Sequence, residues 1–173
     1  MLTAMRRVRR LLGSLCRPRT EGFWWYAPMA AWVAAAGSLA VLMAVDQLTG
    51  WLGHDPGGPS VEVGWGYFLG LVVLSPAVET ALLLATLHAV RKAGLSTPAT
   101  AALAALVWGG LHALVHPAWF FGTVWSFFVF ACAAEAWRAK SGRHAYWAAA
   151  LPHAMVNAAV FAVLALSAGT WPA

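Results

Sequence analysis

Charge is scarce in this chain. Of its 173 residues, only 10% are Asp, Glu, Lys or Arg, whereas 61% are hydrophobic. A soluble domain carries about 25% charged and about 45–50% apolar residues, and a soluble core does not absorb so large an apolar excess. The composition therefore excludes an ordinary soluble domain and predicts a protein that lies in a lipid bilayer.

Cysteine is also scarce, and the chain has no internal repeat. The two cysteines, Cys16 and Cys132, are too few for a disulfide framework and form no cluster of metal ligands. Cys132 lies in an apolar run and is interpreted as a small core residue. The length allows one domain. We predict a basic N-terminal segment over 1–22 and a single transmembrane helical domain over 23–173, with its core over 64–168.

Five segments are long and apolar enough to cross a membrane as helices. They cover residues 24–46, 64–90, 99–116, 118–137 and 145–168. Turn-rich or basic stretches separate them, including the loop 47–63 and the break at His116-Pro117. The predicted fold class is an all-α integral membrane protein of about five transmembrane helices.

The basic residues predict the orientation of these helices. All 11 Lys and Arg residues lie in the N-terminal segment, in the loop 91–97 or in the loop 138–144. With five spans these three segments fall on one face, which should be cytoplasmic. Basic clusters beside membrane spans bind anionic lipid headgroups, so we expect membrane lipids and not nucleic acid as partners. The prediction is a multi-pass protein of the plasma (inner) membrane with a cytoplasmic N-terminus.

Four polar side chains fall near the middle of the predicted spans. A charged group at the bilayer centre costs at least ~2.5–3.5 kcal/mol, so each one needs a reason. At a rise of about 1.5 Å per residue, all four lie about 13–20 Å from the cytoplasmic ends of their helices. They are Glu79, His112, His153 and Asn157. We therefore expect them to converge on one polar layer at the midplane, either as a functional site or as hydrogen bonds that fix the bundle.

Other polar residues of the spans lie nearer the membrane surfaces. Glu135 stands three residues before Arg138, which predicts an ion pair along one helix. His88 falls near the cytoplasmic interface and His116 near the outer one. These positions favour structural roles.

Three short motifs accompany the four central residues. They are Ser75-Pro76-Ala77-Val78-Glu79-Thr80, Trp108-Gly109-Gly110-Leu111-His112 and His153-Ala154-Met155-Val156-Asn157. In order and spacing they resemble the motifs of the CAAX protease and bacteriocin-processing (CPBP or Abi) family of intramembrane endopeptidases. The chain departs from the family pattern at three positions. Thr80 replaces a second Glu, Leu84 replaces an Arg or Gln, and Trp108 replaces a Phe.

The resemblance implies hydrolysis of a peptide bond in a membrane-tethered protein or peptide by a divergent member of this family. Glu79 would activate a water molecule, His112 would share the proton, and His153 and Asn157 would donate hydrogen bonds to the developing oxyanion. We prefer a reaction without a cofactor. A divalent metal such as zinc, bound by Glu79, His112 and His153, is the alternative, and His112 with His116 is a second possible pair of ligands.

Two other classes of function fit the same residues. Intramembrane Glu and His side chains also serve proton relays, so a small proton-coupled transporter is one alternative. No pair of related broken segments of the kind found in transporters is visible, however. The other alternative is a non-enzymatic membrane partner, such as an immunity-type protein.

Overall fold

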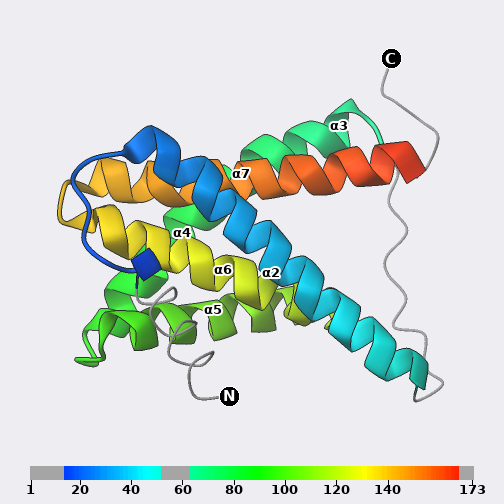
Figure 1. Cartoon of the computed structure of the whole chain (residues 1–173), viewed down its shortest axis with the longest axis horizontal. Helices are drawn as coiled ribbons and strands as arrows, with labels where there is room; N and C mark the ends of the chain where they lie inside the picture. Colours follow the sequence, from blue (N-terminus) through cyan, green and yellow to red (C-terminus); the bar gives the residue numbers. More distant parts are fainter. Residues whose placement is uncertain (1–13, 52–62, 168–173) are drawn as a thin grey trace.

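The fold is a bundle of helices. A computed structural model describes residues 14–51 and 63–167, and every regular element in those two ranges is helical (Figure 1). The elements are α2 (Phe23–Trp51), α3 (Trp65–Phe68), the π-helix η1 (Leu69–Leu74), α4 (Ser75–Arg91), α5 (Thr97–Ala113), α6 (Pro117–Arg138) and α7 (Gly142–Ser167).

The predicted membrane architecture is confirmed. The elements α3, η1 and α4 follow one another without a break, and Trp65–Arg91, α2, α6 and α7 are each long and apolar enough to span a membrane. With its 17 residues, α5 reaches roughly 25 Å, somewhat less than the bilayer's hydrocarbon thickness of about 30 Å. The protein is thus an all-α, multi-pass membrane protein of about five helices.

Three predicted boundaries were wrong, and one of them is the start of α7, which lies at Gly142 instead of 145. The helix α2 continues past residue 46 to Trp51, because the hydroxyl of Thr49 bonds to the carbonyl of Val45 within the helix and Asp46 lies exposed on its surface. The helix α5 ends at Ala113 instead of 116, because Pro117 favours an extended conformation at His116. Most of the loop predicted between the first two spans, including residues 54–60, lies outside the described residues.

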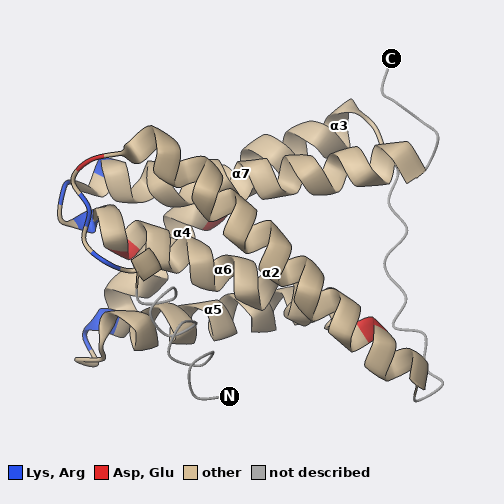
Figure 2. Ribbon diagram, viewed as in Figure 1, with Lys and Arg blue, Asp and Glu red and all other residues tan. Residues whose placement is uncertain are grey.

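Basic residues gather at one end of the bundle. Figure 2 shows the described Lys and Arg residues at the end where α4, α6 and their following turns meet, and none along the rest of the described helices. The loops at this end are those predicted to be cytoplasmic. We therefore call this the cytoplasmic end, and the opposite end the outer end.

The core lies in the cytoplasmic half of the bundle. In α6 the buried residues begin at Ser126 and continue to Trp137, while none is buried between Pro117 and Trp125. In α2 the last buried residue is Ser38, and in α5 it is Gly109. Protein packing therefore holds the cytoplasmic part of the bundle together, whereas the outer ends of these three helices, beyond Ser38, Gly109 and Ser126, are partly or fully exposed.

The contact between α2 and α6 depends on a glycine. The indole of Trp125 lies directly over Gly37, and its Nε1 donates to the carbonyl of Val33 at 2.9 Å. The hydroxyls of Ser38 and Ser126 meet 2.7 Å apart beside it. Small residues allow such close approach of membrane helices, and hydroxyl groups then bond across the interface.

A covalent link joins the N-terminal segment to the bundle. Cys16 forms a disulfide with Cys132 of α6, so the interpretation of Cys132 as merely a small core residue was wrong. Sequence spacing gave no sign of the pairing, because 116 positions separate the two cysteines. The amide of Arg19 also donates to the carbonyl of Ala136, which fixes this segment against the cytoplasmic end of α6.

The buried carboxylate of Glu135 is paired twice. Arg138, one turn along α6, lies 3.2 Å from it, which confirms the predicted pair. Arg91 at the end of α4 bonds to its other oxygen and so connects α4 to α6. These contacts give Glu135 a structural role at the cytoplasmic end.

Candidate active site

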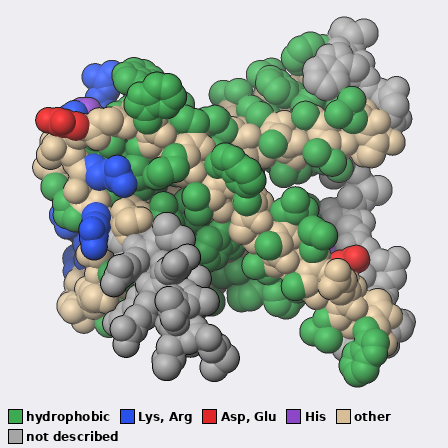
Figure 3. All heavy atoms as spheres, in the orientation of Figure 1, with side chains coloured by type: hydrophobic (Ala, Val, Ile, Leu, Met, Phe, Trp, Pro, Cys, Tyr) green, Lys and Arg blue, Asp and Glu red, His purple; other side chains and the backbone are tan. Residues whose placement is uncertain are grey.

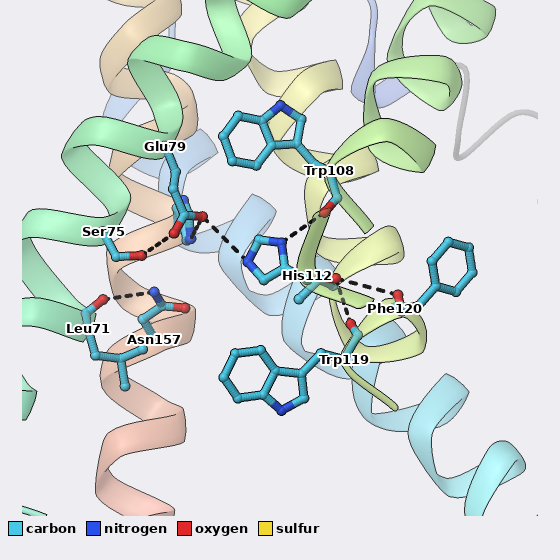
Figure 4. Close-up of polar contacts among 10 residues, drawn as sticks. Leu71, Ser75, Glu79, Trp108, His112, Trp119, Phe120 and Asn157 are labelled. Carbon is cyan, nitrogen blue, oxygen red and sulfur yellow. Dashed lines mark hydrogen bonds and ion pairs between the residues drawn. The ribbon is translucent and has the colours of Figure 1, made fainter. Parts of the chain in front are cut away.

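Three of the predicted residues meet in the middle of the bundle. Glu79 comes from α4, His112 from α5 and His153 from α7. The Oε2 atom of Glu79 lies 3.7 Å from Nε2 of His112 and 3.8 Å from Nε2 of His153. Figure 4 shows the carboxylate pointing across the space between the helices toward the imidazole of His112. The convergence expected from helix depth is therefore present in the fold.

The backbone fixes the tautomer of His112. Its Nδ1 atom lies 2.8 Å from the carbonyl oxygen of Trp108, one turn earlier in α5. A carbonyl only accepts hydrogen bonds, so Nδ1 must carry the proton and the Nε2 atom of the neutral ring is an acceptor. The Nε2 atom facing Glu79 is thus available to bind a proton, a water hydrogen or a metal ion.

Aromatic rings enclose His153. Its imidazole stacks on Phe130 with ring centres 4.7 Å apart, and Phe127 meets it edge-on at 5.4 Å. Phe127 also contacts the ring of His112 at 5.2 Å and stacks on Trp108 at 5.0 Å. These rings hold both histidines in place and exclude water from their cytoplasmic side.

Glu79 is held at one oxygen and free at the other. Ser75, one turn earlier in α4, donates its hydroxyl to Oε1 at 2.5 Å. The Oε2 atom is buried and makes no hydrogen bond within the described part of the chain. A buried acceptor without a hydrogen bond destabilises a protein by about 1–3 kcal/mol. A donor or a cation bound at Oε2 would remove this penalty. Sequence reasoning missed Ser75, although its position four residues before Glu79 puts both on one helix face.

Asn157 lies one turn beyond His153 and binds the backbone of η1. Its Nδ2 atom donates to the carbonyl of Leu71 at 2.8 Å. In this π-helix the amide of Ser75 bonds to the carbonyl of Gly70, five residues back. The residue that would bond to Leu71 in the same register is Pro76, which has no N–H. Pro76 thus frees a carbonyl that Asn157 satisfies, and the second N–H of the amide remains for another acceptor.

Several other predicted residues lie away from the site. His116 is not on one helix with His112; its Nδ1 accepts from the amide of Ala118 and caps α6. His88 is exposed. Thr80 is fully buried and faces the core. A glutamate at that position would have to bury its charge away from the site.

The donor set also fits the chemistry of a metal centre. A metal-bound histidine usually donates its other ring nitrogen to a carbonyl, as His112 does, and ligand atoms around tetrahedral zinc stand about 3.3 Å apart. Within residues 14–51 and 63–167, no group of three His, Cys, Asp or Glu side chains is close enough to hold a metal as placed. Two acceptors bridged by one water would stand about 4.4 Å apart. The separations of 3.7 and 3.8 Å between Glu79 and the two histidines lie between these values. The side chains must therefore move by roughly half an ångström or more to bind either a zinc ion or a bridging water.

No protein-family model matches this chain, and neither a characterised protein nor a solved structure is detectably similar to it.

Proposed function

We propose that this protein is an intramembrane endopeptidase of the plasma (inner) membrane. It hydrolyses a peptide bond in a membrane-tethered protein or peptide, as a divergent relative of the CAAX protease and bacteriocin-processing family. The observation that supports this most strongly is the meeting of Glu79, His112 and His153 around an unbonded carboxylate oxygen. A bundle that needed only hydrogen bonds between helices would have no use for a carboxylate between two imidazoles, because a charged group is costly at this depth.

Each residue of the site has a separate role in the proposed hydrolysis. Glu79 removes a proton from the attacking water as the water oxygen bonds to the scissile carbonyl carbon, and Ser75 keeps the carboxylate in position. The Nε2 atom of His112 takes part in the same proton transfer. His153 and the second N–H of Asn157 donate to the carbonyl oxygen as it gains negative charge. When the C–N bond breaks, the proton held by Glu79 passes to the amine that leaves.

The test compares membrane proteomes of cells that express the wild-type protein or Glu79→Gln. The neutral amide keeps the size of the side chain but removes the base. We expect uncleaved precursors of membrane-tethered proteins to accumulate with Glu79→Gln and not with Asp46→Asn, which neutralises an exposed carboxylate of α2. If no precursor accumulates at equal expression, the protease proposal is wrong, and the partner or transporter alternatives then take its place.

A second measurement addresses the metal. Cleavage of an accumulated precursor by the purified protein is assayed with and without a chelator. We prefer the metal-free reaction and expect activity to persist. Activity that a chelator abolishes and zinc restores would instead assign Glu79, His112 and His153 as zinc ligands.

A further inference from the structure

The packing around the candidate site differs between its two sides. On the cytoplasmic side, Trp108, Phe127 and Phe130 are buried, with at most 6% of their surface exposed. Tyr146 of α7 donates its hydroxyl to the carbonyl of Ala77 in α4, at 3.1 Å, and ties these two helices together beside the site. The site is thus closed toward the cytoplasm by packed aromatic side chains.

The outer side carries no comparable packing in the described chain. Figure 4 places Asn157 of α7 and Trp119 of α6 on opposite walls, further out than His112, and both are partly exposed. Beyond them, α2 buries no residue between Leu39 and Trp51. The side chains of Glu79 and His112 are 22% and 20% exposed. The bundle thus does not enclose these two side chains completely.

The outer halves of α2 and α7 diverge from each other. Figure 1 shows the two helices crossing in the cytoplasmic half and then separating, and Figure 3 shows a hollow between them, which we call the outer cleft. A groove of about 270 Å³ lies between Trp32 of α2 and Met155 and Val156 of α7. The elements α3 and η1 stay with α7, where Phe68 packs on Phe161.

The walls of the outer cleft are apolar. Large apolar side chains are half exposed or more in the outer parts of both helices, for example Met43 on α2 and Val163 on α7. Apart from Asp46, no Asp, Glu, Lys or Arg occurs in 39–51, 63–75 or 154–167, the described outer segments that flank the cleft. A charged or strongly polar chain would be poorly solvated there, whereas an apolar helix would be well accommodated.

On the basis of the proposed function, we infer that the substrate reaches Glu79 through the outer cleft as an apolar helical segment from the outer half of the membrane. Fourteen positions separate His153 from the end of α7 at Ser167, and the same number separates Glu79 from the start of α3 at Trp65. At about 1.5 Å per residue, the site lies about 21 Å from the outer ends of these helices. A helical substrate therefore has its scissile bond about fourteen residues from its outer end, and only the residues at the bond unwind.

Thiol labelling tests the route without requiring catalysis. In the full-length chain with Cys16→Ser and Cys132→Ser, a single cysteine is introduced as Ser75→Cys beside Glu79. A membrane-impermeant methanethiosulfonate is then applied to oriented membrane vesicles from either side. The matched control is Val78→Cys in the same helix, at a residue that is 58% exposed and that we expect to face lipid. Two surface controls, Lys140→Cys and Trp51→Cys, report the cytoplasmic and outer sides.

We expect Ser75→Cys to react at least tenfold faster from the outside than from the inside, and Val78→Cys to react from neither side. Faster labelling from the inside, equal rates, or no labelling from either side would each overturn the inference. Failure of the protease proposal is seen separately, in the Glu79→Gln comparison, because labelling does not depend on hydrolysis.

Substrate length gives a second test in the same vesicles. Two Leu–Ala peptides with a lysine cap at the outer end are added, one with about fourteen apolar residues and one with about seven. We expect only the longer peptide to slow the labelling of Ser75→Cys, while Trp51→Cys continues to react with both present. Equal protection by the two peptides, or protection by neither, would refute the proposed depth of the site.

Discussion

The contact between Trp125 and Gly37 leads to a prediction about stability. A methyl group added at Gly37 would lie 1.8 Å from Nε1 of the indole, whereas real Cβ atoms essentially never approach closer than 3.0 Å. The ring must therefore move by more than about 1 Å, and it then loses its bond to the carbonyl of Val33. Overpacking costs about 1–3 kcal/mol, and a hydrogen bond between membrane helices contributes about 0.6 kcal/mol on average. We expect Gly37→Ala to lower the free energy of unfolding by roughly 2–3 kcal/mol.

The measurement is reversible unfolding in mixed micelles, with helical circular dichroism followed as the denaturing detergent increases. The matched control is Gly50→Ala in the same helix, where an added Cβ meets no atom within 4 Å. This control should be neutral or slightly stabilising, because Ala favours the helix over Gly.

A double-mutant cycle makes the reasoning refutable. In a Trp125→Ala background the obstacle is gone, so Gly37→Ala should cost far less than it does in the wild-type protein. If Gly37→Ala costs the same in both backgrounds, or as little as Gly50→Ala, the described packing of α2 on α6 is wrong.

Three further predictions concern the site and the cytoplasmic end. Ser75→Ala should lower kcat for precursor cleavage by about tenfold, since it removes a hydrogen bond to the charged Glu79; an unchanged kcat would exclude a positioning role. Asn157→Ala should lower the rate by roughly 10²–10³-fold if its amide stabilises the oxyanion, and an effect below tenfold in steady-state kinetics would argue against that role. Glu135→Gln should lower the free energy of unfolding by about 1–3 kcal/mol in the same micelle assay, with no further loss when Arg91→Gln is added if the two side chains act as a pair.

The sequence was sufficient for the architecture because the bilayer sets simple rules. Apolar length predicts spans, and the distribution of Arg and Lys predicts which ends meet on one face. The same rules fail at helix ends. Asp46 was read as the end of a span, yet one exposed carboxylate near the membrane surface does not stop a helix whose polar groups bond within the helix.

The candidate site was partly predictable for a related reason. Helix depth alone placed Glu79, His112 and His153 in one layer, because the rise per residue is constant along a helix. The depth of a residue does not show how its helix is rotated about its axis or which groups on other helices the side chain contacts. The bond that Asn157 makes to the carbonyl of Leu71 and the link between the two cysteines depend on how helices turn toward one another, and one sequence does not give that information. The bond from Ser75 to Glu79 follows instead from their spacing of four residues within one helix.

The length of α2 makes the tilt of this helix depend on the thickness of the membrane. Its 29 residues reach roughly 43 Å, well beyond the hydrocarbon layer of about 30 Å, and Figure 1 shows it lying obliquely across the bundle. Its apolar stretch from Phe23 to Val45 alone reaches roughly 35 Å, and a helix whose apolar stretch exceeds the hydrocarbon thickness tilts more as the bilayer thins. Because no residue of α2 beyond Ser38 is buried, we expect a change of tilt to alter the distance between its outer half and α7. We therefore expect the chain length of the lipids to change the separation between the outer halves of α2 and α7.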